Sequence, residues 1–128
     1  MDAVLMQKDG RIDRTECIHK LKELCEAYGD ILGRVILFGS VARGDHTEQS
    51  DIDLYVESKN TKITTAKLEQ SSRLRKFEHR LYDMYSGTEF DILAFGGKRD
   101  LLRVRKTLLW KQIEKDGVVL YDKRSEAI

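Results

Sequence analysis

The segment from Arg34 to Val56 constrains the fold more than any other part of the chain. Residues 34–38 form a short apolar run of the kind that makes a buried strand, and Gly39 and Ser40 follow it directly. Glycine lets the backbone approach a ligand closely, and a helix that begins at residues 41–43 would face an anion with its N-terminus. We therefore predict a strand, a turn that can bind phosphate and a short helix, in this order.

Two carboxylates lie one residue apart in the next predicted strand, residues 50–56. Because side chains alternate between the faces of a strand, Asp51 and Asp53 share one face and the apolar residues of the segment share the other. Neighbouring carboxylates repel each other, so their charged forms favour a cation between them, and Mg²⁺ suits such oxygen ligands. A solvated edge strand also explains an isolated Asp-x-Asp pair, and a strand-to-helix turn explains Gly39-Ser40 alone. The combination of the two is what favours a phosphate and metal site.

Two further residues of this segment are candidates for nucleotide binding. Arg43 could reach a phosphate, or it could hold Asp51 or another acid in place. Ser50 directly precedes the first carboxylate. His46 lies between the two halves of the motif, where we expect a solvated loop side chain.

A third carboxylate occurs in the strand-like run at residues 88–95. Its apolar residues alternate, which places Asp91 on the opposite face together with Glu89. An unpaired buried carboxylate is costly, so Asp91 should face a metal, a basic partner or water. Glu89 is the alternative ligand, although its position nearer the start of the strand favours contact with solvent.

The spacing of these residues is similar to a known signature. Gly39-Ser40, ten intervening residues and Asp51-x-Asp53 resemble the DNA polymerase beta superfamily of nucleotidyltransferases. The fuller strings Gly-Ser-x-Ala-Arg-Gly and Ser-Asp-Ile-Asp-Leu resemble its small prokaryotic branch, the minimal nucleotidyltransferases. The resemblance implies an α/β, polymerase-beta-like fold with a small mixed sheet flanked by helices. It also implies that Gly39 and Ser40 bind nucleotide phosphates, and that Asp51, Asp53 and a carboxylate on a later strand, here Asp91, hold divalent metal.

A nucleotidyltransferase with this site would use ATP and two Mg²⁺ ions to transfer a nucleotide to an acceptor hydroxyl group. Minimal nucleotidyltransferases commonly act as the antitoxin of a HEPN ribonuclease toxin, which implies a HEPN partner that receives AMP on a tyrosine and forms a hetero-oligomer with the chain. Transfer to a small hydroxyl compound such as an aminoglycoside is an alternative. A noncatalytic antitoxin that acts by binding alone is another.

Length and composition limit the surroundings of the site. With 128 residues, we expect one nucleotidyltransferase domain over residues 1–128, with the acceptor supplied by another molecule. A net charge of +1 does not favour nucleic acid as the direct substrate. No apolar run has membrane length, so we expect a cytoplasmic protein without membrane contact, in which Cys17 and Cys25 are reduced core residues. Two basic runs, residues 62–80 and 98–111, are typical of solvated helix faces, and a binding surface is the alternative.

Hydrophobic periodicity predicts the other elements. Amphipathic patterns predict helices over residues 14–28, 64–85 and 99–115, and a short apolar run predicts a closing strand at 118–121. Trp110 belongs to the apolar side of the last helix, where we favour a core position over an interface.

Overall fold

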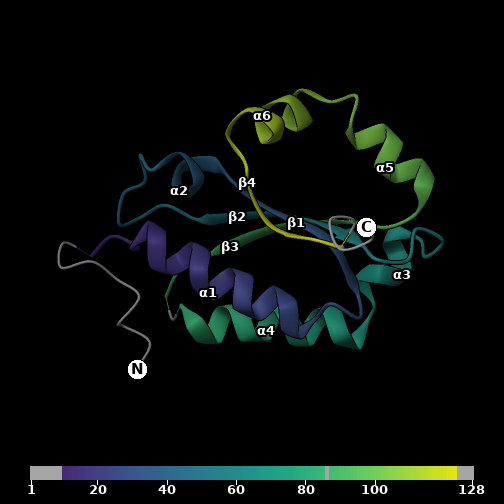
Figure 1. Ribbon diagram of the computed structural model, residues 1–128, viewed down its shortest axis with the longest axis horizontal. Helices are drawn as coiled ribbons and strands as arrows, with labels where there is room; N and C mark the ends of the chain where they lie inside the picture. Colours follow the sequence, from purple (N-terminus) through teal and green to yellow (C-terminus); the bar gives the residue numbers. More distant parts are fainter. Residues whose placement is uncertain (1–9, 86, 124–128) are drawn as a thin grey trace.

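A four-stranded sheet in the order β3-β2-β1-β4 forms the centre of the molecule (Figure 1). The computed structural model describes residues 10–85 and 87–123. The strands are β1 (Leu32–Phe38), β2 (Ile52–Ser58), β3 (Phe90–Phe95) and β4 (Val118–Asp122). The helices are α1 (Arg14–Ala27), α2 (Gly39–Arg43), α3 (Thr65–Glu69), α4 (Ser72–Met84), α5 (Lys98–Val104) and α6 (Leu108–Asp116). β1 is antiparallel to β2 and β4, whereas β2 and β3 are parallel, so the sheet is mixed, as predicted.

Helices cover both faces of this sheet (Figure 1). α1 and α4 pack on one face, where Ile52, Leu54 and Val56 of β2 are fully buried. α5 and α6 cover the other face, where Tyr55 and Trp110 belong to a second core cluster. Trp110 is 6% exposed, which confirms its predicted core position. β2 therefore carries apolar residues on both faces, and its carboxylates lie only at the edge of the second core.

Two predicted helices are each divided in the structure. The predicted helix over residues 64–85 consists of α3 and α4, and the one over residues 99–115 consists of α5 and α6. Ser71 caps the start of α4 and Thr107 the start of α6, and each side-chain oxygen accepts the backbone N–H of the third residue after it. These bonds satisfy amides at a new helix start, so the helix begins again there despite the continuous apolar pattern. The prediction of single long helices was wrong at these two positions.

The predictions for α1 and the closing strand are confirmed. α1 begins after Asp13, whose side chain accepts the backbone N–H of Glu16, and β4 covers the predicted closing strand. Cys17 and Cys25 are free thiols on the buried side of α1, and burial raises their pKa values to about 11 and about 12. Among residues 10–85 and 87–123, the helices are too short or too polar to cross a membrane.

Candidate functional site

Two neighbouring strands bring the predicted carboxylates together. In the parallel pair of β2 and β3, Asp53 lies directly opposite Asp91. Side chains opposite each other in a sheet project from the same face, so both carboxylates lie on the face that α5 and α6 cover. Asp51 immediately precedes β2 and is exposed, as is Asp91, whereas Asp53 is half-buried. Residues 38 positions apart in the sequence thus form one acidic group at the start of two strands.

Gly39 places the backbone of the turn against this acidic group. Phe38, the last residue of β1, pairs with Asp53, and the chain then turns into α2 at Gly39. Gly39 has a φ of +81°, and a Cβ atom there would lie 2.1 Å from Asp53 Oδ2. Both the backbone conformation and the close approach therefore require glycine at this position. The turn that is predicted to bind phosphate therefore lies in direct contact with the carboxylate of Asp53.

The electrostatics of Asp53 indicate a site for a cation. Burial, followed by the charges of Asp91 and Asp51, raises the pKa of Asp53 to about 6, against the opposing charge of Arg43. A carboxyl group with two acidic neighbours holds its negative charge at a cost, and a bound cation removes that cost. This pKa also shows that Asp51 and Asp91 both act on Asp53 through space.

The short helix α2 is fixed to the rest of the molecule by Arg14. Arg14 Nε donates to the carbonyl oxygens of Val41, at 3.2 Å, and Ala42, at 3.0 Å. Its Nη2 atom donates to the Ala42 oxygen at 2.8 Å. These carbonyls lie near the C-terminal end of α2, where a basic group also favours the helix dipole. No local signal in the sequence predicts this role, because Arg14 is 28 residues from Ala42.

Arg43 pairs with two acids outside the predicted group. Its Nε lies 3.1 Å from Asp45 Oδ2, and its Nη1 lies 3.8 Å from Asp116 Oδ2 at the end of α6. Of the two predicted roles, this geometry matches the one in which Arg43 holds an acid, and its contact with a phosphate stays a prediction. Asp116 was not among the predicted site residues, since only the fold brings α6 to α2.

Ser50 forms part of a local turn beside the acidic group. Its hydroxyl oxygen accepts the backbone N–H of Thr47 at 2.8 Å, and its own N–H donates to the Thr47 carbonyl oxygen at 3.2 Å. These bonds close the loop that leads into β2. The contact between Ser50 and a nucleotide stays a prediction.

His46 differs from its prediction. It is 6% exposed, and its Nε2 lies 2.6 Å from the carbonyl oxygen of Ile12, to which it donates. Its Nδ1 is buried and has no hydrogen-bond partner within the described part of the chain. The expectation of a solvated loop histidine was wrong, because the segment before α1 folds over this loop and covers the ring.

The oxygen ligands at this end of the sheet suit magnesium. Asp51, Asp53 and Asp91 are all carboxylates, and the raised pKa of Asp53 shows where positive charge is needed. Within residues 10–85 and 87–123, no three acidic, histidine or cysteine side chains lie close enough together to hold an ion by themselves. Mg²⁺ keeps several waters and takes phosphate oxygens as ligands, so a complete protein cage is not required. The set fits an ion that a nucleotide completes.

Three hollows in the described surface lie away from these carboxylates. One is at the far end of β1 and β2, the second lies between α5, α6 and the end of β3, and the third lies between α1 and α4. None of the three is lined by Asp51, Asp53 or Asp91. We locate the candidate site by its carboxylates, because the charges and the register bear directly on the chemistry and the depth of a hollow does not.

Comparison with known proteins decides the family. The family described as "Polymerase beta, Nucleotidyltransferase" matches residues 19–126, which include the Gly39 turn and all three carboxylates. The chain belongs to this family. It has a nucleotidyltransferase domain of this family, with the mixed sheet and flanking helices that the sequence predicted.

Individual relatives agree with this assignment. A Methanocaldococcus jannaschii protein named "Putative protein adenylyltransferase" is 51% identical to this nucleotidyltransferase over 35 residues, which make up 27% of this chain and 35% of the relative. The match thus spans about a third of the relative's length.

Two crystal structures of toxin–antitoxin proteins contain chains of similar fold. One structure, with AMP-PNP, matches with a TM-score of 0.56 and 21% identity, over 85% of this chain and 76% of that chain. The other, a mutant of the toxin–antitoxin MntA-HpeT, matches with a TM-score of 0.56 and 19% identity over the same shares. At these identities the likeness establishes the shared fold.

Proposed function

We propose that this nucleotidyltransferase transfers AMP from ATP to a tyrosine of a HEPN ribonuclease toxin and thereby acts as its antitoxin. The observation that carries the proposal is the pairing of Asp53 with Asp91 beside the glycine turn at Gly39. The resemblance of the motif to minimal nucleotidyltransferases supports the acceptor. The adenylyltransferase name of one relative and the toxin–antitoxin origin of two fold neighbours also support it.

Each residue of the site would have a distinct role in this transfer. The turn at Gly39 and Ser40 would bind the nucleotide phosphates through backbone N–H groups and the serine hydroxyl. Asp51, Asp53 and Asp91 would hold two Mg²⁺ ions. When bound, these ions neutralise phosphate charge and lower the pKa of the acceptor hydroxyl.

The reaction would then be an in-line displacement at the α-phosphorus of ATP. The tyrosine oxygen forms a bond to the α-phosphorus, the bond from that phosphorus to the bridging oxygen of the β-phosphate breaks, and pyrophosphate leaves. The hydroxyl proton passes to solvent, which reaches the exposed Asp51 and Asp91. The exposure of these two carboxylates also leaves room for a tyrosine on the surface of another protein.

The test uses labelled ATP, Mg²⁺ and the product of the adjacent gene, provided that it carries the Arg-x₄-His motif of HEPN ribonucleases. We expect label from the α-phosphate to be transferred to a tyrosine of that protein. Asp51→Asn combined with Asp53→Asn should reduce the initial rate by at least about a thousandfold, because the negative charge that holds the ions is lost. Asp83→Asn, the same chemical change at an exposed position of α4, is the matched control and should retain the parental rate.

The same variants separate this proposal from its alternatives. If the double variant neutralises the toxin as well as the parent does, the chain acts by binding and the proposal is wrong. If aminoglycosides become labelled and the HEPN protein does not, the acceptor is a small hydroxyl compound. Loss of both labelling and neutralisation in the double variant, with both retained in Asp83→Asn, supports the proposal.

A further inference from the structure

A hollow with several charged residues in its lining lies at the end of β1 and β2 that is remote from the carboxylates. It encloses about 290 Å³, and Arg34, Glu57, Lys59 and Lys123 are among its lining residues. Arg34 lies four residues along β1 from Phe38 at the carboxylate end, a distance of about 13 Å along the strand. The hollow is therefore separate from the candidate transfer site.

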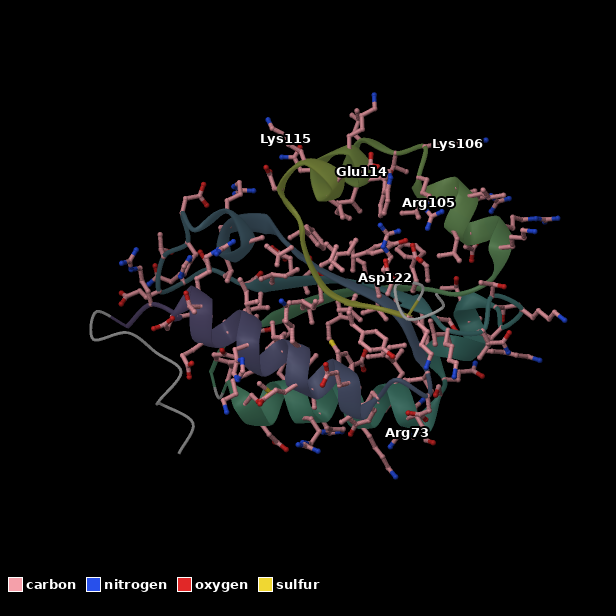
Figure 2. The ribbon with its side chains drawn as sticks, in the orientation of Figure 1. Arg73, Arg105, Lys106, Glu114, Lys115 and Asp122 are labelled. Atoms are coloured by element: carbon pink, nitrogen blue, oxygen red, sulfur yellow. The ribbon has the colours of Figure 1, made fainter. Side chains whose placement is uncertain are left out.

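The carboxylate of Glu57 already has close partners in this hollow. Its side chain is 9% exposed, and Oε2 accepts the hydroxyl of Tyr55 and, at 2.8 Å, an N–H of Arg105. Figure 2 shows Arg105 extending from the end of α5 toward the sheet. Arg34 Nη1 is farther from the same oxygen, at 4.0 Å. Arg105 is thus the nearer partner of Glu57, while Arg34 lies at ion-pair distance from Glu57 and, at 3.8 Å, from Asp122. The excess positive charge of the hollow is shared by Arg34, Lys59 and Lys123.

Arg34 also has a buried donor that forms no hydrogen bond. Its Nε is enclosed by protein and donates to no residue in the described ranges. Asp122 Oδ2 is 3.8 Å away, which is too long for a hydrogen bond, and the ring of Trp110 lies beside the guanidinium, 5.4 Å from its centroid to Cζ. An unsatisfied buried donor costs about 1–3 kcal/mol, so a small side-chain shift that brings Nε to a ligand oxygen would be favoured.

The strands are irregular where they present Arg34. Just before Arg34, β1 has one residue more than β2, and Gly33 is the extra residue of this bulge. A Cβ atom on Gly33 would lie 2.7 Å from the carbonyl oxygen of Ser58, so the approach of the two strands requires glycine. The pairing of β1 with β4 also shifts after Val35. Bulges redirect side chains and are frequent beside binding sites, and here the bulge aligns Arg34 with the hollow.

We propose that this hollow binds a phosphate group of a small ligand, with Arg34 as the main donor and Lys59 and Lys123 as supporting charges. A guanidinium group binds phosphate oxygens through paired N–H groups, which would include the unsatisfied Nε. The volume of about 290 Å³ is near the lower limit of ligand pockets and suits phosphate, pyrophosphate or the phosphate tail of a nucleotide. The proposal does not depend on the identity of the acceptor or on nucleotidyl transfer.

The tryptophan fluorescence of the full chain gives a direct test. Trp110 is the single tryptophan of the chain and lies against both Arg34 and Arg105. Inorganic phosphate, pyrophosphate and ATP are titrated separately without Mg²⁺ at constant ionic strength. We expect a saturable change for at least one of them, with a Kd of about 1 mM or less, and the tightest identifies the source of the phosphate. A change that stays linear for all three up to about 10 mM overturns the proposal.

Two variants and one matched control locate the binding. Arg34→Gln should weaken it by about tenfold, and Lys59→Ala, at an exposed position that does not threaten folding, by about threefold. Lys62→Ala removes the same charge from the same loop outside the hollow and should leave the Kd unchanged. Unchanged binding in Lys59→Ala overturns the proposal. So does unchanged binding in Arg34→Gln, because the ligand would then occupy another site, such as the turn at Gly39 and Ser40.

Discussion

The two ends of β2 carry an acid on the same face of the sheet, in opposite surroundings. Asp53 at the start of the strand has Asp51 and Asp91 as neighbours, and its pKa is raised to about 6. Glu57 near the other end is more deeply buried, yet it pairs with Arg105 at 2.8 Å. Alternation along β2 therefore places Asp53 beside two other acids and Glu57 beside a basic residue of the protein, Arg105.

The difference separates a functional acid from a structural one. A buried acid that the fold neutralises contributes to a fixed arrangement of helices, here α5 over the sheet. An acid that the fold leaves beside like charges costs stability, and the proposed metal ions would remove that cost. Depth of burial alone would have selected Glu57 as the unusual residue. The identity of the neighbours selects Asp53.

Among single substitutions, the largest expected effect comes from removing the partner of Asp53 on β3. Asp91→Asn should lower the rate of AMP transfer by at least about a hundredfold, because one of the three carboxylates at the transfer site loses its charge. Glu89→Gln, two residues earlier, should change the rate by less than about threefold. Initial rates with the HEPN partner measure both. If Glu89→Gln loses more of the transfer rate than Asp91→Asn does, Glu89 is the third metal ligand, and the role assigned to Asp91 beside Asp53 is wrong.

Replacement of Glu57 should lower the stability of the protein and leave the rate of AMP transfer unchanged. Glu57→Gln leaves Arg105 without its charged partner and should lower the free energy of unfolding by about 2 kcal/mol. Urea denaturation measures the loss, and Glu69→Gln at an exposed position of α3 should stay within about 0.5 kcal/mol of the parent. The transfer rate per folded molecule should be unchanged in both. A stable but inactive Glu57→Gln protein would contradict the structural role of this acid.

The smallest expected effect is a gain in stability when Asp53 is replaced, in contrast to the loss expected for Glu57→Gln. The pKa of Asp53 is raised in the folded state, so the unfolded chain releases this proton first and the folded state loses stability as the pH rises from about 4 to about 6. Asp53→Asn should therefore stabilise the metal-free protein above pH 6, by about 1 kcal/mol after allowance for solvent screening, and have no such effect below pH 4.

Urea denaturation at several pH values with a chelator present measures this gain, and added Mg²⁺ and nucleotide should stabilise the parent more than the variant. If Asp53→Asn destabilises the protein at pH 8 as Glu57→Gln does, the two acids are alike and the comparison fails.

Local patterns in the sequence predicted the parts of the site that each lie within one strand or turn. The apolar run before Gly39 and the alternation around Asp53 identified β1 and β2, and the same alternation singled out Asp91 in β3. The third carboxylate could be chosen because a charged residue in an apolar strand conflicts with its surroundings. The sequence alone shows this charged residue within an apolar segment.

Other features depended on competing local bonds or on distant neighbours. Side-chain caps at Ser71 and Thr107 divided two helices whose apolar pattern is continuous, since one hydroxyl can restart a helix without altering the periodicity. His46 became buried because Ile12, 34 residues earlier, lies against it. Arg14 and Asp116 act on α2 from the two ends of the described chain, and no local signal marks them.

The sequence by itself determined which residues can do chemistry: a glycine turn, two carboxylates in one strand and one in another. Only the tertiary structure decided which charges meet. It placed Asp53 opposite Asp91, and it placed Glu57 beside Arg105 across 48 residues. The physical reason is that alternation and turn formation act over a few residues, whereas the energy of a charge depends on every group that folding brings near it.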